Sequence, residues 1–265
     1  MAEPRALLQV QPQYAMREEW QNFALREKLT YEPIEFSMPA LLERDSSDFP
    51  ACLAWYKDSG LVTALHGAFI DINPASGDPA FRRLSRKRCE ESCLLASELG
   101  AKYVVLHGSA FPFLRGVYLE YWADTCAEFY GELAERHNLT LCIENSLDLN
   151  PEPLQALMKR ISDKRVRVCL DIGHANYSEA PLEAWFDAIG EYIAYLHLSD
   201  NTGHYDDHLP LGKGTVDWAK ADSLWRGLRR DTPMTLEVGN MYRIEESLRY
   251  LRSNRFFGLR ADTDE

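Results

Sequence analysis

The chain has 265 residues, 46% of them hydrophobic and 26% charged, which is ordinary for a globular protein with a substantial core. It carries 29 Lys and Arg against 41 Asp and Glu, and the net charge of −12 argues against a broad basic surface for nucleic acid. The first residues lack the features of a signal peptide, and no run approaches the ~20 apolar residues of a membrane span.

The six cysteines are scattered and form no CxxC pair. Cys142 and Cys169 lie inside apolar runs, where a thiol is usually a small core residue. This usage predicts free thiols in a reducing compartment, so we expect a cytoplasmic protein.

A repeating unit organises the chain: a short apolar run, an ionisable residue, a loop and a longer amphipathic stretch. The runs predict strands at 7–10, 31–36, 61–66, 103–107, 139–144, 166–171, 192–197 and 234–237. The stretches predict helices at 15–29, 79–99, 117–136, 151–161, 181–189, 218–229 and 244–252. Gly60 and Gly100 stand where helix C-caps belong. The segment 38–59 is the least regular, with a short helix expected near 51–58.

Eight strands alternating with helices predict a parallel α/β fold, and the length favours a single (β/α)8 TIM barrel over residues 1–265. The carboxyl ends of barrel strands meet at one mouth, where the side chains that follow them can form one pocket. Six of the eight runs end on a potential metal ligand: His66, His107, Glu144, Asp171, His197 and Glu237.

Each of these residues also has a purely structural interpretation. His66 and His107 share the pattern LHG, and either could be a hydrogen-bonded strand-end histidine. Glu144 and Glu237 could each pair with a distant arginine. A metal site is favoured instead, because the two histidines share one local pattern and no basic residue closely follows either glutamate.

Two further motifs follow the sixth and seventh strands. Asp171 and His174 form a D-x-x-H step in which a turn would return His174 to the pocket; the alternative is that Asp171 only caps a helix. Asp206 and His208 form a D-x-H step in a loop, with Asp207 turned outward. By contrast, His204 is expected on the loop surface and His137 in a structural role.

Crowded carboxylates and histidines are costly unless a cation lies between them. His, Glu and Asp ligands without Cys favour zinc, manganese, cobalt or iron over a sulfur-bound structural site. The predicted cofactor is therefore a divalent metal, zinc or manganese, as one to three ions.

The motifs CIEN, LDIGHAN, LHLSDN and DDHLPLGKGTVDW resemble those of the xylose isomerase-like TIM-barrel superfamily, which unites sugar and sugar-phosphate isomerases and epimerases with endonuclease IV, the AP endonuclease family 2. The resemblance extends from about the third strand to the C-terminus. In the epimerase branch it implies one metal on Glu144, Asp171, His197 and Glu237. The two glutamates would act as acid and base, and His174 would contact the substrate.

In the endonuclease branch the resemblance implies three zinc ions. The first would be held by His66, His107 and Glu144, the second by Glu144, Asp171, His197 and Glu237, and the third by His174, Asp206 and His208. All nine positions carry the required residue type. However, LDIGHAN and HLPLGKGTVDW resemble the isomerase-like members more closely, and the loops that would enter DNA look short.

Two enzymatic functions are therefore in competition. The favoured one is a metal-dependent isomerase or epimerase of a sugar or sugar phosphate, with Glu144 and Glu237 as acid and base and His174 at the substrate. Lys213 or Arg243 would then meet a phosphate. The alternative is a tri-zinc phosphoesterase acting on abasic DNA or on a small phosphoester. A small-molecule sugar partner is expected rather than nucleic acid or a membrane, and a homo-oligomer is an expectation from barrels in general.

Overall fold

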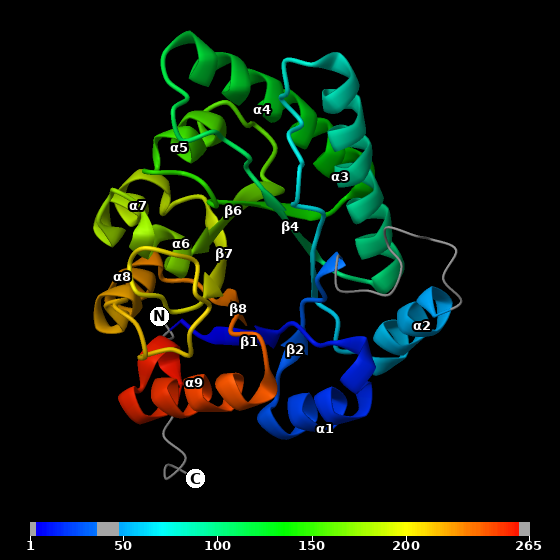
Figure 1. Cartoon of the computed structure of the whole chain (residues 1–265), viewed down its shortest axis with the longest axis vertical. Coiled ribbons are helices and arrows are strands. Elements are labelled where there is room, and N and C mark those ends of the chain that lie inside the picture. The colour runs from blue at the N-terminus through cyan, green and yellow to red at the C-terminus, as the bar shows by residue number, and fades with distance from the viewer. Residues whose placement is uncertain (1–3, 36–47, 260–265) are drawn as a thin grey trace.

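The computed structural model describes residues 4–35 and 48–259. Eight strands form one sheet in the order β2-β1-β8-β7-β6-β5-β4-β3, with parallel pairing throughout. Parallel bridges from Tyr31 to Val62 and from Ile34 to His66 bring the β2 and β3 ends of the sheet together. The sheet therefore closes into a barrel, and Figure 1 looks along it with the helices around the outside.

The strands match the predicted runs closely. They are β1 Ala6–Val10, β2 Thr30–Tyr31, β3 Ala64–His66, β4 Tyr103–His107, β5 Thr140–Glu144, β6 Val166–Asp171, β7 Ile193–Leu198 and β8 Thr232–Leu236. The predicted second strand, 31–36, is too long. Pro33 has no N–H to donate to a ladder, and beyond Tyr31 only the isolated bridge at Ile34 continues the pairing. Phe36 and the predicted irregular segment up to residue 47 lie outside the described residues.

The helices lie where the amphipathic stretches predicted them. They are α1 Arg17–Glu27, α2 Phe49–Ser59, α3 Pro79–Leu99, α4 Val117–His137, α5 Glu152–Met158, α6 Ile172–Tyr177, α7 Leu182–Ile189, α8 Trp218–Leu228 and α9 Met241–Asn254, with short 3-10 turns at Tyr14–Met16 and Phe256–Gly258. Helix α6 was not predicted. It has only six residues, and a glycine at its second position hides the helical pattern.

Local capping contributes at the ends of helices α2 and α3. The Asp78 carboxylate accepts hydrogen bonds from the N–H groups of Ala80 and Phe81 at the start of α3. Gly60 and Gly100 follow α2 and α3 in the left-handed conformation, at φ of 65° and 76°, as predicted for C-caps. None of the helices in the described ranges is long and apolar enough to cross a membrane.

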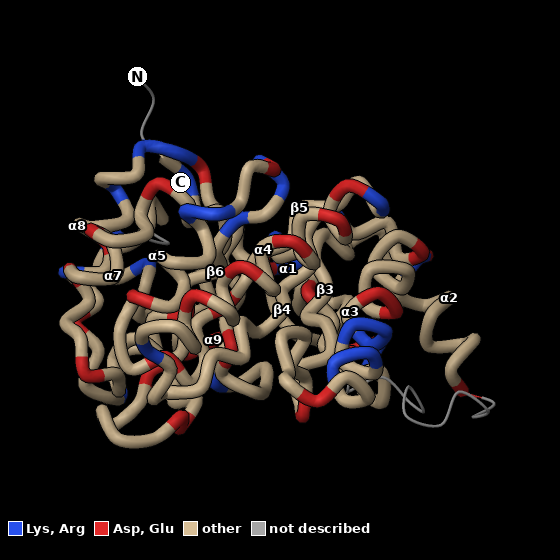
Figure 2. The backbone as a smooth tube through the Cα atoms, turned by 90° about the horizontal axis from the view of Figure 1, so that it is seen from above, with Lys and Arg blue, Asp and Glu red and all other residues tan. Residues whose placement is uncertain are grey.

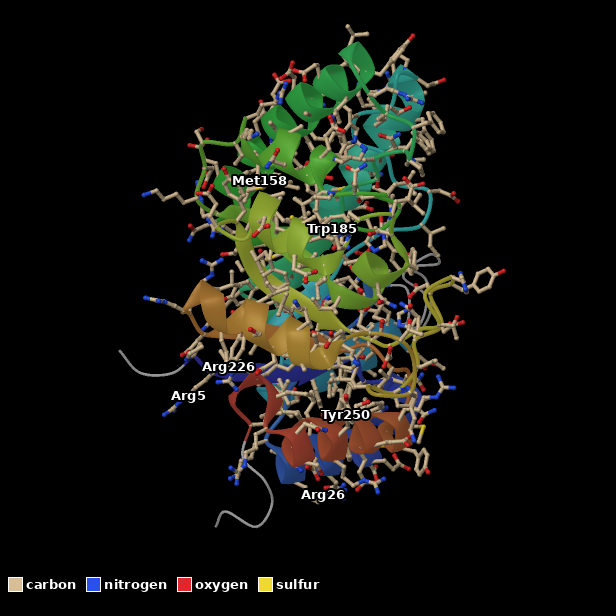
Figure 3. The ribbon with its side chains drawn as sticks, turned by 90° about the vertical axis from the view of Figure 1, so that its left-hand side faces the viewer. Arg5, Arg26, Met158, Trp185, Arg226 and Tyr250 are labelled. Atoms are coloured by element: carbon tan, nitrogen blue, oxygen red, sulfur yellow. The ribbon has the colours of Figure 1, made fainter. Side chains whose placement is uncertain are left out.

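The core has two parts. The larger lies between the sheet and the helices and includes Trp20, Trp185 and Trp225, all buried. Figure 3 labels Trp185, a residue of α7 whose side chain is fully buried. The smaller part fills the barrel itself: Ala64, Val105, Cys142, Cys169 and Tyr195. All six cysteines are buried free thiols, as predicted.

The barrel interior explains why the mouth is polar. Alternate residues of a strand point to the same side, so the side chain two positions beyond each interior residue also points inward, closer to the mouth. Applied to the five residues that fill the barrel, this rule yields His66, His107, Glu144, Asp171 and His197. The register places His107 beside Glu144 and Asp171 beside His197 on neighbouring strands.

Candidate metal centre

The structure brings all nine predicted ligands into one connected cluster at the mouth. Glu144 is its hub, because its carboxylate oxygens lie within 3.6 Å of a nitrogen of four histidines. His197 Nδ1 is 3.0 Å from Glu144 Oε1 and 3.4 Å from Glu237 Oε1. The four histidines are His66, His107, His174 and His197.

Three groups of described residues bring one ligand atom each to within 4.8 Å of one another. They are His66 with His107 and Glu144, His66 with His197 and Glu237, and the four-residue group Glu144, Asp171, His197 and Glu237. The first and the third coincide with ligand sets that the family resemblance implied. The four-residue group is buried throughout.

The remaining set, His174, Asp206 and His208, is joined through Asp206. Its Oδ2 atom lies 3.4 Å from His174 Nε2 and 3.0 Å from His208 Nε2. Asp207 points away, as predicted, and accepts hydrogen bonds from the backbone and hydroxyl of Thr202.

The expectation for Asp171 needs a correction. It does cap a helix, because its Oδ1 atom accepts a hydrogen bond from the N–H of His174 at 2.6 Å, at the start of α6. Helix α6, rather than a simple turn, returns His174 to the cluster. The other oxygen, Oδ2, remains directed at the cluster, 4.0 Å from His174 Nδ1. Capping and membership of the cluster are therefore compatible.

Two buried carboxylate oxygens in the four-residue group, Glu144 Oε2 and Asp171 Oδ2, accept no hydrogen bond. Buried anionic oxygens are costly in that state unless a cation lies against them. Burial raises the pKa of Asp171 to about 6. Burial also opposes the ionisation of Glu144, but His197 and His107 hold its pKa well below the ordinary value. These residues fit a divalent metal ion.

The hydrogen bonds of the imidazoles support the same assignment. His66, His174 and His208 each donate from Nδ1 to a backbone carbonyl, those of Gly67, Asn145 and Glu237. Each Nε2 atom faces a carboxylate of the cluster and is the nitrogen that would bind a metal ion. Metal-binding histidines are commonly oriented by such an outer hydrogen bond, which also fixes the tautomer.

His197 is oriented by a residue that the sequence did not identify. Its Nε2 atom lies 3.1 Å from Glu32 Oε1, and both side chains are fully buried. Tyr195 and Thr235 donate their hydroxyl hydrogens to Glu32 Oε2. Glu32 stands inside the run YEPIEF rather than at its end, so the strand-end pattern missed it.

The basic residues expected at the mouth do not line it. Lys213 is paired with Glu246 at 2.9 Å, and Arg243 donates to the carbonyl of His208. Figure 2 shows that Lys and Arg gather on α3. There, Arg82 and Arg86 bind the backbone carbonyls of Ser76 and Pro74.

A cavity of about 510 Å³ opens beside the cluster. His107, His174 and Asp206 belong to both, so the cavity borders the cluster through these three side chains. The volume lies within the range of small-molecule sites. His137, at the end of α4, instead lies 3.6 Å from Glu90 on the outside, consistent with its expected structural role.

Residues 27–254 match the sequence model of the family described as xylose isomerase-like TIM barrel. The match begins before the third strand, and so extends further than the motifs alone. An uncharacterized protein of Methanocaldococcus jannaschii, MJ1311, is 30% identical over 189 residues, which are 67% of this chain and 64% of that protein. A probable endonuclease 4 of Mycoplasmoides gallisepticum is 29% identical, over 60% of this chain and 58% of that protein. The chain thus spans less than two thirds of these relatives.

Solved structures share the fold over nearly the whole chain. The TTHB071 protein of Thermus thermophilus, solved after soaking with ZnCl2, has a TM-score of 0.74 at 24% identity and covers 93% of this chain and 97% of its own. A D-tagatose 3-epimerase-like protein has a TM-score of 0.66 at 21% identity, covering 94% and 87%. Endonuclease IV of Thermus thermophilus has a TM-score of 0.65 at 20% identity, covering 94% and 98%. The fold neighbours therefore include enzymes of both expected kinds.

Proposed function

The chain belongs to the xylose isomerase-like TIM barrel family, and on that premise we propose that it is a metal-dependent isomerase or epimerase of a sugar or sugar phosphate. The observation that carries the proposal is the buried group Glu144, Asp171, His197 and Glu237, beside a cavity of small-molecule size. All four of these side chains can bind a metal ion, and the two glutamates among them can also transfer protons.

Glu144, Asp171, His197 and Glu237 would hold one divalent ion, zinc or manganese. When bound, such an ion polarises a carbonyl and a neighbouring hydroxyl, which acidifies the carbon between them. His174 lies on the cavity wall and would orient a substrate hydroxyl.

The proton transfers belong to the two glutamates. One removes the proton from the carbon next to the carbonyl, and the electron pair of the C–H bond moves toward the carbonyl oxygen. The other delivers a proton to the opposite face of that carbon, which inverts it. Glu144 Oε1 and Glu237 Oε1 lie 3.0 and 3.4 Å from the same atom, His197 Nδ1, and this proximity supports a role for both in one reaction.

The test is turnover of ketohexoses by zinc- or manganese-loaded protein in D2O, followed by NMR. We expect epimerised product that carries deuterium at the inverted carbon. Glu144→Gln and Glu237→Gln should each lower turnover by about 100-fold or more, the scale of general acid–base catalysis. His137→Ala is the control and should stay within about twofold of the wild type. Full turnover by the Glu144 variant would refute the mechanism.

A second candidate function is a tri-zinc phosphoesterase, favoured by one specific observation: Asp206 joins His174 and His208 into a further set of potential ligands. Three bound ions would supply the chemistry of phosphoester hydrolysis. The net charge of −12 argues against duplex DNA as the substrate, because phosphate contacts usually require several Lys or Arg.

Metal content and one variant separate the two candidates. The tri-zinc phosphoesterase requires close to three zinc ions per chain, cleavage of abasic-site DNA or a small phosphoester, and severe loss in His208→Ala. The epimerase requires one ion for turnover and tolerates His208→Ala with a milder loss. Cleavage of a phosphoester at three zinc ions per chain, without any epimerisation, would replace the first proposal by the second.

A further inference from the structure

Part of the wall of the cavity beside the metal centre is apolar. Its lining includes five apolar side chains from three loops and from helix α3: Phe69, Ile72, Phe81, Phe111 and Leu147. A volume of about 510 Å³ is in the range that holds a drug-sized ligand and exceeds what one sugar ring requires. The wall therefore has room for a second, apolar part of the substrate.

Phe111 is the ring best placed to contact that second part. It lies in the loop between β4 and α4, is 47% exposed, and still lines the cavity. Phe113 stacks against it, with ring centroids 5.7 Å apart and an interplanar angle of 11°. The two rings pack nearly parallel, and Phe111 is the one of the pair that lines the cavity. An exposed, braced aromatic ring is a typical stacking platform for a ligand.

The charge of the cavity wall limits the ligand further. The described residues that line it include two aspartates, Asp71 and Asp206, but no Lys or Arg. Phosphate and carboxylate groups are usually held by arginine, lysine or a helix N-terminus. Among the described lining residues an anionic group would meet apolar, acidic and neutral polar side chains, and the histidines of the cluster, but no Lys or Arg. A neutral substituent is therefore favoured over a phosphate.

We propose that the substrate is an uncharged, two-part molecule: a sugar that meets the metal centre and carries the ketone that the proposed epimerisation requires, and an apolar, ring-bearing substituent that stacks on Phe111. The inference rests on the proposed function, and it replaces "sugar or sugar phosphate" by an unphosphorylated, glycoside-like substrate. Phe111 is then a specificity-determining residue rather than a catalytic one.

The experiment is calorimetric binding to zinc-loaded protein with three probes: phenyl β-D-glucopyranoside, methyl β-D-glucopyranoside and D-glucose 6-phosphate. The phenyl and methyl galactosides repeat the comparison for a second sugar. We expect the phenyl glycosides to bind between about twofold and about tenfold more tightly than the methyl glycosides, the range of one aromatic stacking contact. The sugar phosphate should bind more weakly than the phenyl glucoside.

Phe111→Ala should abolish the preference for phenyl and leave the affinity for the methyl glycosides within about twofold. Phe111→Leu keeps an apolar side chain without a ring and should retain only part of the preference. Tyr118→Ala is the matched control, because Tyr118 is an aromatic residue 72% exposed on α4 that does not line the cavity. It should bind all probes like the wild type. Equal zinc content and melting temperature exclude misfolding in each variant.

Equal binding of phenyl and methyl glycosides, absence of binding by all neutral probes, or tighter binding of the phosphate would each overturn the inference. These outcomes are distinct from failure of the proposed function. Epimerisation of free ketohexoses without any phenyl preference would refute the substrate class alone. A phenyl preference that depends on Phe111, without deuterium exchange on any sugar, would refute the epimerase and keep the binding site.

Discussion

Glu32 contacts none of the cavity, yet it fixes the orientation of His197. Its carboxylate lies 3.1 Å from His197 Nε2, which leaves Nδ1 for the cluster. Outer-shell partners of this kind typically contribute 10- to 100-fold to metal affinity. We expect Glu32→Gln to weaken zinc binding by about that factor, measured by competition with a chelator.

The control for this prediction is Glu35→Gln. Glu35 is also fully buried, but it pairs with Arg88 at 2.6 Å, and no contact joins it to a histidine of the cluster among the described residues. It should lower the melting temperature and keep zinc affinity within about twofold. Equal loss of affinity in both variants would mean that Glu32 acts only through stability.

Asp148 gives a prediction about pH. Burial raises its pKa to about 7, and its Oδ1 atom has no hydrogen-bond partner. An unfolded aspartate has a pKa of ~3.9. Between about pH 4 and 7 the carboxyl group is thus protonated in the native state and ionised in the unfolded state, so unfolding releases a proton. The free energy of unfolding therefore decreases as the pH rises through that window. Asp148→Asn should therefore be more stable than the wild type at pH 8, by up to a few kcal/mol. The difference should vanish near pH 3.5. Denaturant unfolding at both pH values measures it, and a pH-independent difference would contradict the assignment.

At the scale of elements, the loop between β7 and α8 is what delivers Asp206 and His208. Asp200 holds this loop by accepting hydrogen bonds from the N–H groups of Gly212 and Val216 and from the indole of Trp218. Gly214 packs so closely that a Cβ would lie 2.2 Å from the carbonyl oxygen of Asn201. The backbone at Asn201 cannot move aside to make room for this Cβ as a flexible side chain could.

Gly214→Ala should therefore displace the loop and impair metal binding by Asp206 and His208. We expect the melting temperature to drop by several degrees. In protein that binds three zinc ions, the zinc content should fall by one ion per chain. Gly227→Ala is the matched control, because Gly227 lies in α8 with nothing within 4 Å of an added Cβ. It should be neutral or stabilising, by up to about 1 kcal/mol. Similar losses in both variants would contradict the role given to the loop.

For the whole molecule, the buried carboxylates make folding sensitive to metal. A ligand that binds only the native state stabilises it by about 2.7 kcal/mol at a free concentration 100 times its dissociation constant. For a domain of this size that corresponds to roughly 5–10 °C in melting temperature. Removal of metal with a chelator should produce such a decrease, and added zinc should restore it. An unchanged melting temperature would show that the cluster does not hold a metal tightly.

The sequence predicted the barrel because the strands and nearly all of the helices have local sequence patterns. The nine clustered residues could be predicted because they stand at strand ends or in the segments just beyond them. Glu32 could not, because its role arises from a contact with the distant residue His197, and Asp148 could not, because its raised pKa arises from burial in the folded chain. Helix α6 was missed because its six residues carry too little periodicity. The residues that line the cavity could not be predicted, because they come together through loop conformations that no local sequence pattern encodes.

The distribution of the cluster over the strands has a consequence for biosynthesis. The four-residue group draws on β5, β6, β7 and the residue after β8, so it remains incomplete until Glu237 has left the ribosome. A nascent or truncated chain without Glu237 can offer only partial and weaker sites. Binding of one ion by all four of these side chains would then follow translation of the chain as far as Glu237.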